Sequence, residues 1–169
     1  KDEARRALGL ALAPAERLVL VCGHLIERKD PLLALEVFER TPEAQRLVFL
    51  GRGPLERELT NAIRARGLAA RVELRGEVEP SVLAQWYAAA DLLLLTSRRE
   101  GRPNVVLEAL SSGRPVLATD AGGTAEVLGA LAERMLSRTR EPAALAAQLG
   151  RLLTASFAPE ALRGAVAHF

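Results

Sequence analysis

The sequence is poor in the residues that disulfide-bonded and metal-binding proteins need. It has one cysteine, Cys22, and two histidines that stand far apart, His24 and His168. A single cysteine excludes a disulfide framework within the chain and a metal site built on cysteine pairs. Because there is also no Asp-x-Asp motif and no histidine cluster, we expect no metal cofactor.

Long apolar runs are missing as well. No run approaches the roughly 20 residues of a membrane-spanning helix, and no signal peptide opens the chain. Cys22 lies in a short apolar run, where we expect a buried, reduced thiol. These features predict a cytoplasmic protein.

Aromatic residues make up only 4% of the chain and hydrophobic residues 49%, so the core must consist mainly of Leu, Val and Ala. The 23 basic and 21 acidic residues are interleaved, which does not favour nucleic-acid binding. A length of 169 residues suits one domain. Because the chain begins with Lys1 rather than Met, we interpret residues 1–169 as a single domain of a longer protein.

Apolar runs of strand length alternate with helix-like segments along nearly the whole chain. This alternation predicts an α/β fold with a doubly wound, Rossmann-like parallel sheet of about six strands flanked by helices. The expected strands are 18–22, 46–50, 72–75, 92–95, 116–118 and 134–136. Helices are expected to begin at Pro31, Pro54, Pro80, Pro103, Thr124, Pro142 and Pro159.

Glycines and cations follow the predicted strands. In parallel sheets, ligands bind outside the carboxyl ends of the strands, where these residues gather. Glycine turns let backbone amides approach an anion, and Arg28 and Lys29 stand just before a helix N-terminus. The pattern predicts a phosphorylated ligand, such as a nucleoside diphosphate.

Two carboxylates, Glu100 and Glu108, stand with seven residues between them in the stretch after the fourth strand. Glu108 is either a ligand for two ribose hydroxyls or a solvated residue on an amphipathic helix. Glu100 either contacts other hydroxyls or developing positive charge, or is a surface charge. We expect Trp86 and Tyr87 to pack in the core rather than to stack on a base.

Together these residues resemble the E-x7-E signature of retaining glycosyltransferases of the GT-B fold, in glycosyltransferase family 4. The resemblance covers most of the chain. Its motifs are Gly23 with Lys29, Gly51-x-Gly53-Pro54, Val72-x-Leu74-x-Gly76-x-Val78, Tyr87-x-x-Ala90-Asp91, Glu100-Gly101-x-Pro103, Leu107-Glu108-Ala109-Leu110-x-x-Gly113-x-Pro115-Val116 and Gly122-Gly123-x-x-Glu126.

The resemblance implies a domain that binds a nucleotide-diphosphate sugar. It assigns catalysis and sugar contact to Glu100 and ribose binding to Glu108. Residues assigned to the donor diphosphate are Gly23, His24, Arg28, Lys29, Gly101, Arg102, Pro103, Asn104 and Val105. Residues assigned to lining the base are Gly51, Gly53, Arg75, Gly76, Glu77 and Val78. Many members carry arginine where this chain has His24, and because of this departure we expect Arg28 to take over that role.

The resemblance also implies that this chain is the C-terminal donor half of a hexosyltransferase, and that the acceptor-binding N-terminal domain lies outside these residues. The isolated half is then expected to be inactive, and any membrane association to pass through the other domain. The sugar, lipid or other acceptor is not specified. Two alternatives stay open: a nucleotide-sugar epimerase of the GT-B type, and a non-catalytic nucleotide-binding module.

Overall fold

The computed structural model describes all 169 residues and contains one six-stranded parallel sheet with the strand order β3-β2-β1-β4-β5-β6. The strands are β1 (Leu18–Cys22), β2 (Arg46–Leu50), β3 (Val72–Gly76), β4 (Leu92–Leu95), β5 (Val116–Thr119) and β6 (Leu136–Ser137). The predicted doubly wound, Rossmann-like architecture is therefore confirmed.

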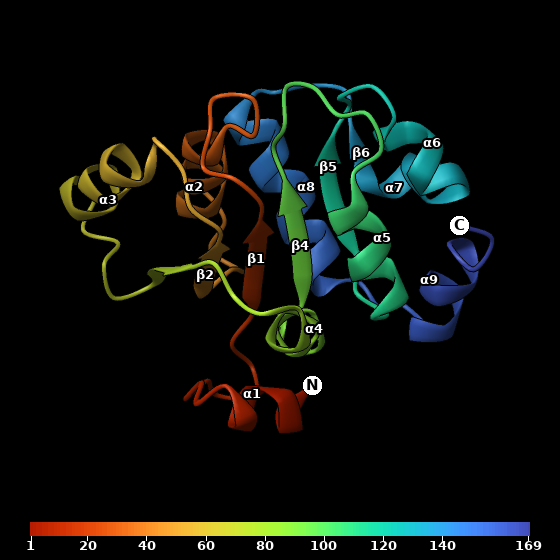
Figure 1. The fold of residues 1–169 in the computed structure, drawn as a ribbon, viewed down its shortest axis with the longest axis horizontal. Helices are drawn as coiled ribbons and strands as arrows, with labels where there is room; N and C mark the ends of the chain where they lie inside the picture. The colour runs from red at the N-terminus through yellow and green to blue at the C-terminus, as the bar shows by residue number, and fades with distance from the viewer.

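The sheet lies between helices (Figure 1). The helices are α1 (Asp2–Ala7), α2 (Pro31–Glu39), α3 (Glu56–Ala65), α4 (Pro80–Ala89), α5 (Asn104–Ser111), α6 (Thr124–Leu128), α7 (Ala132–Met135), α8 (Pro142–Thr154) and α9 (Pro159–Ala165), with a 3-10 turn at Gly129–Leu131. In Figure 1, α4 and α5 stand in front of the central strands, and α2 and α8 stand behind them.

The central strands are apolar on both faces because both faces are covered. All four residues of β4 and all four of β5 are buried. Strands buried on both sides lose the alternation of polar and apolar residues, and the continuous run Leu92–Leu95 shows this pattern. Phe38 and Phe49 are the largest fully buried side chains in a core otherwise dominated by Leu and Val.

The chain changes direction in the middle of the sheet. It builds β1, β2 and β3 outward, returns through α4 and then builds β4, β5 and β6 outward on the other side. The neighbouring strands β1 and β4 therefore flank a topological switch point, beside which open α/β sheets bind their ligands.

At the amino ends of β1 and β4, Asp91 bonds to the N-terminal helix α1. Its Oδ2 accepts from Arg5 Nη2 at 2.6 Å and from the Leu18 amide at 2.7 Å. Arg5 is only 4% exposed and also donates to the Ala89 carbonyl at 3.1 Å. This buried cluster holds α1 against the end of α4 and the start of β1.

Two predicted boundaries are wrong by two residues, and those of three other elements differ by one, since β3 ends at Gly76, β5 ends at Thr119 and α5 begins at Asn104. The sixth strand is not 134–136 but Leu136–Ser137, because residues 132–135 form α7 and β6 pairs only with the end of β5. The third helix begins at Glu56 rather than Pro54, because the Leu55 amide donates to the Leu25 carbonyl at 3.0 Å and so belongs to a turn. None of the helices is long and apolar enough to cross a membrane.

Candidate functional site

The loops at the carboxyl edge of the sheet bond to one another. The Arg98 amide donates to the Arg28 carbonyl at 2.7 Å, joining the loop after β4 to the loop after β1. The Glu100 amide donates to the Ala121 carbonyl at 2.6 Å, joining it to the loop after β5. Backbone bonds between loops thus bring distant parts of the sequence to one place.

Lys29 and Glu100 form a shielded ion pair at this edge. Lys29 Nζ lies 2.6 Å from Glu100 Oε1, and the two side chains are 17% and 5% exposed. Ser97 Oγ donates to the same oxygen at 2.5 Å. Both contacts fall on Oε1, and Oε2 makes no hydrogen bond within the chain. The two residues predicted to serve phosphate and sugar are therefore direct neighbours.

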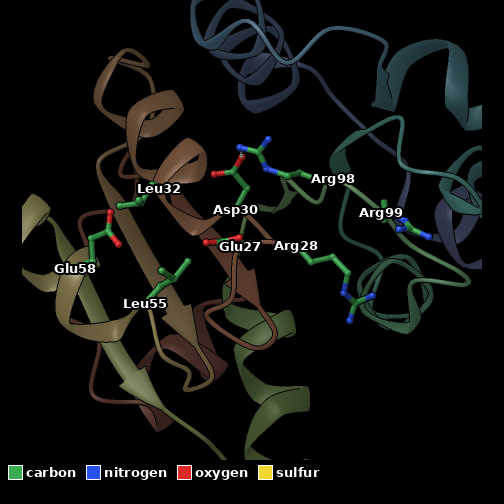
Figure 2. Close-up of a pocket in the computed structure, with 8 residues that line it drawn as sticks. All are labelled: Glu27, Arg28, Asp30, Leu32, Leu55, Glu58, Arg98 and Arg99. Carbon is green, nitrogen blue, oxygen red and sulfur yellow. Dashed lines mark ion pairs between the residues drawn. The ribbon is translucent and has the colours of Figure 1, made fainter.

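A second ionic cluster supports this pair. Asp30 Oδ2 forms an ion pair with Arg98 Nη2 at 2.7 Å and accepts a hydrogen bond from Arg140 Nη2 at 2.6 Å, and Figure 2 shows Asp30 facing Arg98. Arg140 Nη1 also donates to the Ser97 carbonyl at 2.8 Å. Arg140 thereby connects Asp30, which follows Lys29 in the chain, to Ser97, whose hydroxyl bonds to Glu100.

Glycines permit the close approach of these loops. A Cβ on Gly123 would lie 1.6 Å from the Gly101 carbonyl oxygen, and a Cβ on Gly51 would lie 2.1 Å from the Gly23 carbonyl oxygen. Gly51 also has a φ of 132°, a conformation that other residues rarely adopt. No side chain larger than hydrogen fits at either position.

Beside the switch point lies a cavity of about 360 Å³. It opens between the ends of β1 and β2, the segment after β3, and helices α4 and α5. Its lining residues are Cys22, Gly23, His24, Leu50, Gly51, Glu77, Val78, Leu83, Val105 and Glu108. Seven of the residues predicted to bind the nucleotide sugar thus share one cavity, namely Gly23, His24, Gly51, Glu77, Val78, Val105 and Glu108.

The buried Tyr87 on α4 forms a hydrogen bond with Glu108 on α5. Glu108 is exposed toward the cavity, and its Oε2 accepts from the Tyr87 hydroxyl at 2.7 Å. Tyr87 and Trp86 are both 2% exposed, as predicted for core residues. The contact of Tyr87 with Glu108 was not predicted, since nothing in the sequence shows that α4 and α5 lie side by side.

Burial changes the acidity of two side chains next to this cavity. It raises the pKa of the Cys22 thiol to about 12. Burial, together with the nearby Cys22 and Glu108, also raises the pKa of Tyr87. Both groups therefore stay protonated at neutral pH, and the Tyr87 hydroxyl is a hydrogen-bond donor to the Glu108 carboxylate.

Not every predicted residue lies in this cavity. Arg28 lines a separate cavity of about 660 Å³ on the other side of its loop, with Glu27, Asp30 and Arg98 (Figure 2). The Arg75 guanidinium lies over the Trp86 ring at 5.5 Å and pairs with Glu73 at 2.8 Å, so it does not line the base cavity.

The other predicted residues shape the surroundings. Gly53 packs against the Leu25 backbone and Gly76 against the Arg52 guanidinium. Gly101, Arg102 and Asn104 are exposed and Pro103 is buried at the entrance to α5. The Asn104 and Val105 amides at the start of α5 donate to no carbonyl and so can meet an anion, whereas the Val106 amide donates to the Pro103 carbonyl at 3.0 Å.

Across the chain no three His, Cys, Asp or Glu side chains come close enough together to hold a metal ion. Lys29, Arg98 and Arg140 bring positive charge to this edge of the sheet.

Comparison with known proteins gives a family match and fold matches over nearly the whole of this chain. Residues 16–155 match the family described as "Glycosyl transferases group 1". The D-inositol 3-phosphate glycosyltransferase of Nocardia farcinica is 36% identical over 163 residues, which are 90% of this chain and 36% of that protein. The chain spans little more than a third of the length of the curated relatives it matches.

Two solved structures show the fold. The sucrose-phosphate synthase of Thermosynechococcus elongatus aligns with a TM-score of 0.81 and 26% identity, over 98% of this chain and 42% of that one. A variant of S. aureus TarM in complex with UDP aligns with a TM-score of 0.76 and 20% identity, over 93% of this chain and 32% of that one. The six-stranded sheet thus corresponds to one half of a GT-B fold.

Proposed function

Because the chain belongs to the glycosyl transferases group 1 family, we propose that it is the C-terminal, donor-binding half of a retaining glycosyltransferase of family 4. The full-length enzyme would transfer a hexosyl group from a nucleotide-diphosphate sugar to a sugar, lipid or other acceptor. Its acceptor domain would lie in a part of the protein outside these 169 residues.

The observation that carries this proposal is the spacing of two carboxylates along one loop and helix. Glu100 sits with Lys29 at the loop, and Glu108 sits beside the cavity, with the first turn of α5 between them. A nucleotide sugar presents the same order of groups: sugar, diphosphate, ribose and base. Lys29 and the α5 amides suit the diphosphate, Glu108 suits the ribose, and Val78 and Leu83 offer apolar walls to a base.

The chain's own residues suggest how the donor bond would be weakened. Departure of the nucleotide diphosphate leaves negative charge on its phosphates. Lys29, together with the α5 amides, would stabilise that charge in place of a metal ion. The free Oε2 of Glu100 would orient the sugar or stabilise the positive charge that develops on it.

If catalysis takes place in a cleft between two domains, this chain alone should bind the nucleotide but not transfer the sugar. Positioning of donor against acceptor supplies a large part of the rate, and this chain contains only the donor residues. We therefore expect the isolated chain to bind the nucleotide and to transfer no sugar. Any contact of the full-length protein with a membrane would pass through its other domain.

Calorimetry with UDP, GDP and ADP in the presence of EDTA tests the proposal. UDP is the first probe because the TarM structure contains it. We expect at least one of the three to bind without metal, and Lys29→Gln to weaken that binding by about tenfold or more, since a charge-assisted bond is lost. Arg151→Gln, an exposed change on α8, is the matched control. Binding that requires Mg²⁺, or that Lys29→Gln leaves intact, contradicts the proposal.

A further inference from the structure

The contact between α4 and α5 gives Glu108 a fixed partner. The Tyr87 hydroxyl reaches from α4 and donates to Glu108 Oε2 at 2.7 Å. Tyr87 itself is 2% exposed, so its ring is held by the core, whereas Glu108 faces the cavity. A rigid donor thus meets an otherwise mobile acceptor.

A glutamate on a helix surface normally samples many rotamers, and ordering such a side chain costs free energy. The hydrogen bond from Tyr87 holds one carboxylate oxygen before any ligand arrives. The other oxygen, Oε1, makes no hydrogen bond within the chain, and because Glu108 lines the cavity it can accept a hydroxyl hydrogen from a ligand there. Preorganisation of this kind strengthens binding because less freedom is lost when the ligand binds.

The surroundings of the Tyr87 hydroxyl explain why it donates its hydrogen to Glu108. The polar groups that act on it are the Cys22 thiol and the Glu108 carboxylate, and the site is buried. An ionised carboxylate only accepts hydrogen bonds. The hydroxyl hydrogen therefore points to Glu108, because an ionised carboxylate is a much stronger acceptor than the neighbouring Cys22 sulfur.

We propose that Tyr87 is a positioning residue that orients Glu108 toward the ribose, so that the site prefers ribonucleotides over 2′-deoxyribonucleotides. This inference rests on the proposed function, in which Glu108 meets the ribose hydroxyls. Tyr87 acts through Glu108 and does not itself touch the ligand. Its contribution is therefore expressed in the preference between the two sugars, and not only in the strength of binding.

The test uses Tyr87→Phe, which removes one oxygen and keeps the ring. The probe is whichever of UDP, GDP or ADP binds the wild-type chain best, with its 2′-deoxy form, and Kd is measured by calorimetry. The wild-type chain should bind the ribonucleotide roughly tenfold more tightly than the deoxy form, as expected for one hydrogen bond to a carboxylate. In Tyr87→Phe this ratio should fall to about threefold or less.

Two further variants separate orientation from general loss of structure. Glu108→Gln should also lower the ratio, and adding Tyr87→Phe to it should change the ratio little further, because both act on one contact. Thr41→Val removes a buried hydroxyl that bonds the Val37 carbonyl at 2.7 Å, far from the cavity. It should lower the melting temperature and leave the ratio unchanged.

Failure of this inference differs from failure of the proposed function. If Glu108→Gln lowers the ratio and Tyr87→Phe does not, the role of Tyr87 is overturned while the donor site stands. If the wild-type chain does not distinguish the two sugars, the role of Tyr87 is overturned as well. If no nucleoside diphosphate binds, both proposals fall.

Discussion

Glu100 already has a strong partner before any ligand arrives. Its Oε1 is 2.6 Å from Lys29 Nζ, and the pair is largely shielded from water. A diphosphate that approaches Lys29 must share the ammonium with this carboxylate and also tolerate its negative charge. The free energy of binding therefore includes the cost of weakening an existing ion pair.

Glu100→Gln should for this reason tighten the binding of bare UDP, or of whichever nucleoside diphosphate binds. The change removes the competing charge and keeps the side-chain shape. We expect Kd to fall by roughly three- to tenfold, in line with the modest net value of a charged hydrogen bond. Calorimetry measures this directly.

Glu160→Gln, at an exposed position on α9, controls for the loss of one negative charge from the whole chain. Unchanged or weaker binding by Glu100→Gln would mean that Lys29 does not meet the phosphates. The same variant should lose stability, because it leaves the shielded Lys29 without its counterion.

Single residues differ in how far the sequence reveals them. The proximity of Lys29 and Glu100 was predictable because both follow strands whose carboxyl ends meet at one edge. Arg140 was not, since it follows a two-residue strand and reaches Ser97 and Asp30 only through the tertiary fold. The contact of Tyr87 with Glu108 was missed for the same reason. Local pattern cannot show which side chain of a buried helix reaches the next helix.

Among the elements, loops at the carboxyl edge depend on glycine for their mutual contact. Gly123→Ala would place a methyl group 1.6 Å from the Gly101 carbonyl oxygen, which is backbone and cannot rotate away. The loops after β4 and β5 must then separate. We expect a loss of at least about 2 kcal/mol in the free energy of unfolding, together with weaker nucleotide binding.

Gly164→Ala is the matched control for this change. Gly164 lies in α9 and a Cβ there meets nothing within 4 Å. Alanine should leave nucleotide binding unaltered and raise stability by up to about 1 kcal/mol, because glycine is the weaker helix former. Urea unfolding of the two variants gives the comparison. Wild-type stability in Gly123→Ala would show that the two loops do not touch.

Elements were predictable where turn residues mark their ends. Prolines at 31, 80, 142 and 159 occupy the first turn of α2, α4, α8 and α9, as expected from the fixed φ of proline. The sixth strand was placed too early because the short segment 132–136 has no such marker. Residues 132–135 form a helix that buries Met135 in the core, and hydrophobic periodicity over so few residues cannot reveal that packing.

At the scale of the whole molecule, global stability should depend on pH in the alkaline range. Burial raises the pKa of Cys22 from the ordinary 9.0 to about 12. Between these values the unfolded chain has lost the thiol proton and the folded chain has kept it. The unfolded state thus binds fewer protons, so the free energy of unfolding falls as pH rises, by about 1.4 kcal/mol per pH unit.

The prediction is checked by urea unfolding of wild type and Cys22→Ala at pH 8 and pH 10. Wild type should lose about 1.4 kcal/mol more than the variant over this interval. Tyr87, whose pKa is also raised, contributes a fall of the same sign above its ordinary value of 10.0 in both proteins, so the difference isolates Cys22. Equal losses would show that the thiol is accessible to water in the folded chain.

The bonds between loops at the carboxyl edge also limit how such a site can be altered. The Arg98 amide bonds to the Arg28 carbonyl and the Glu100 amide to the Ala121 carbonyl, so the conformation of each loop depends on that of its neighbours. A chimera that receives one loop from another enzyme would inherit mismatched partners on both sides. Under the proposed function, new donor specificity in this scaffold would therefore be gained by exchanging the segments 23–30, 96–103 and 120–123 as one block, and evolution by recombination would face the same constraint.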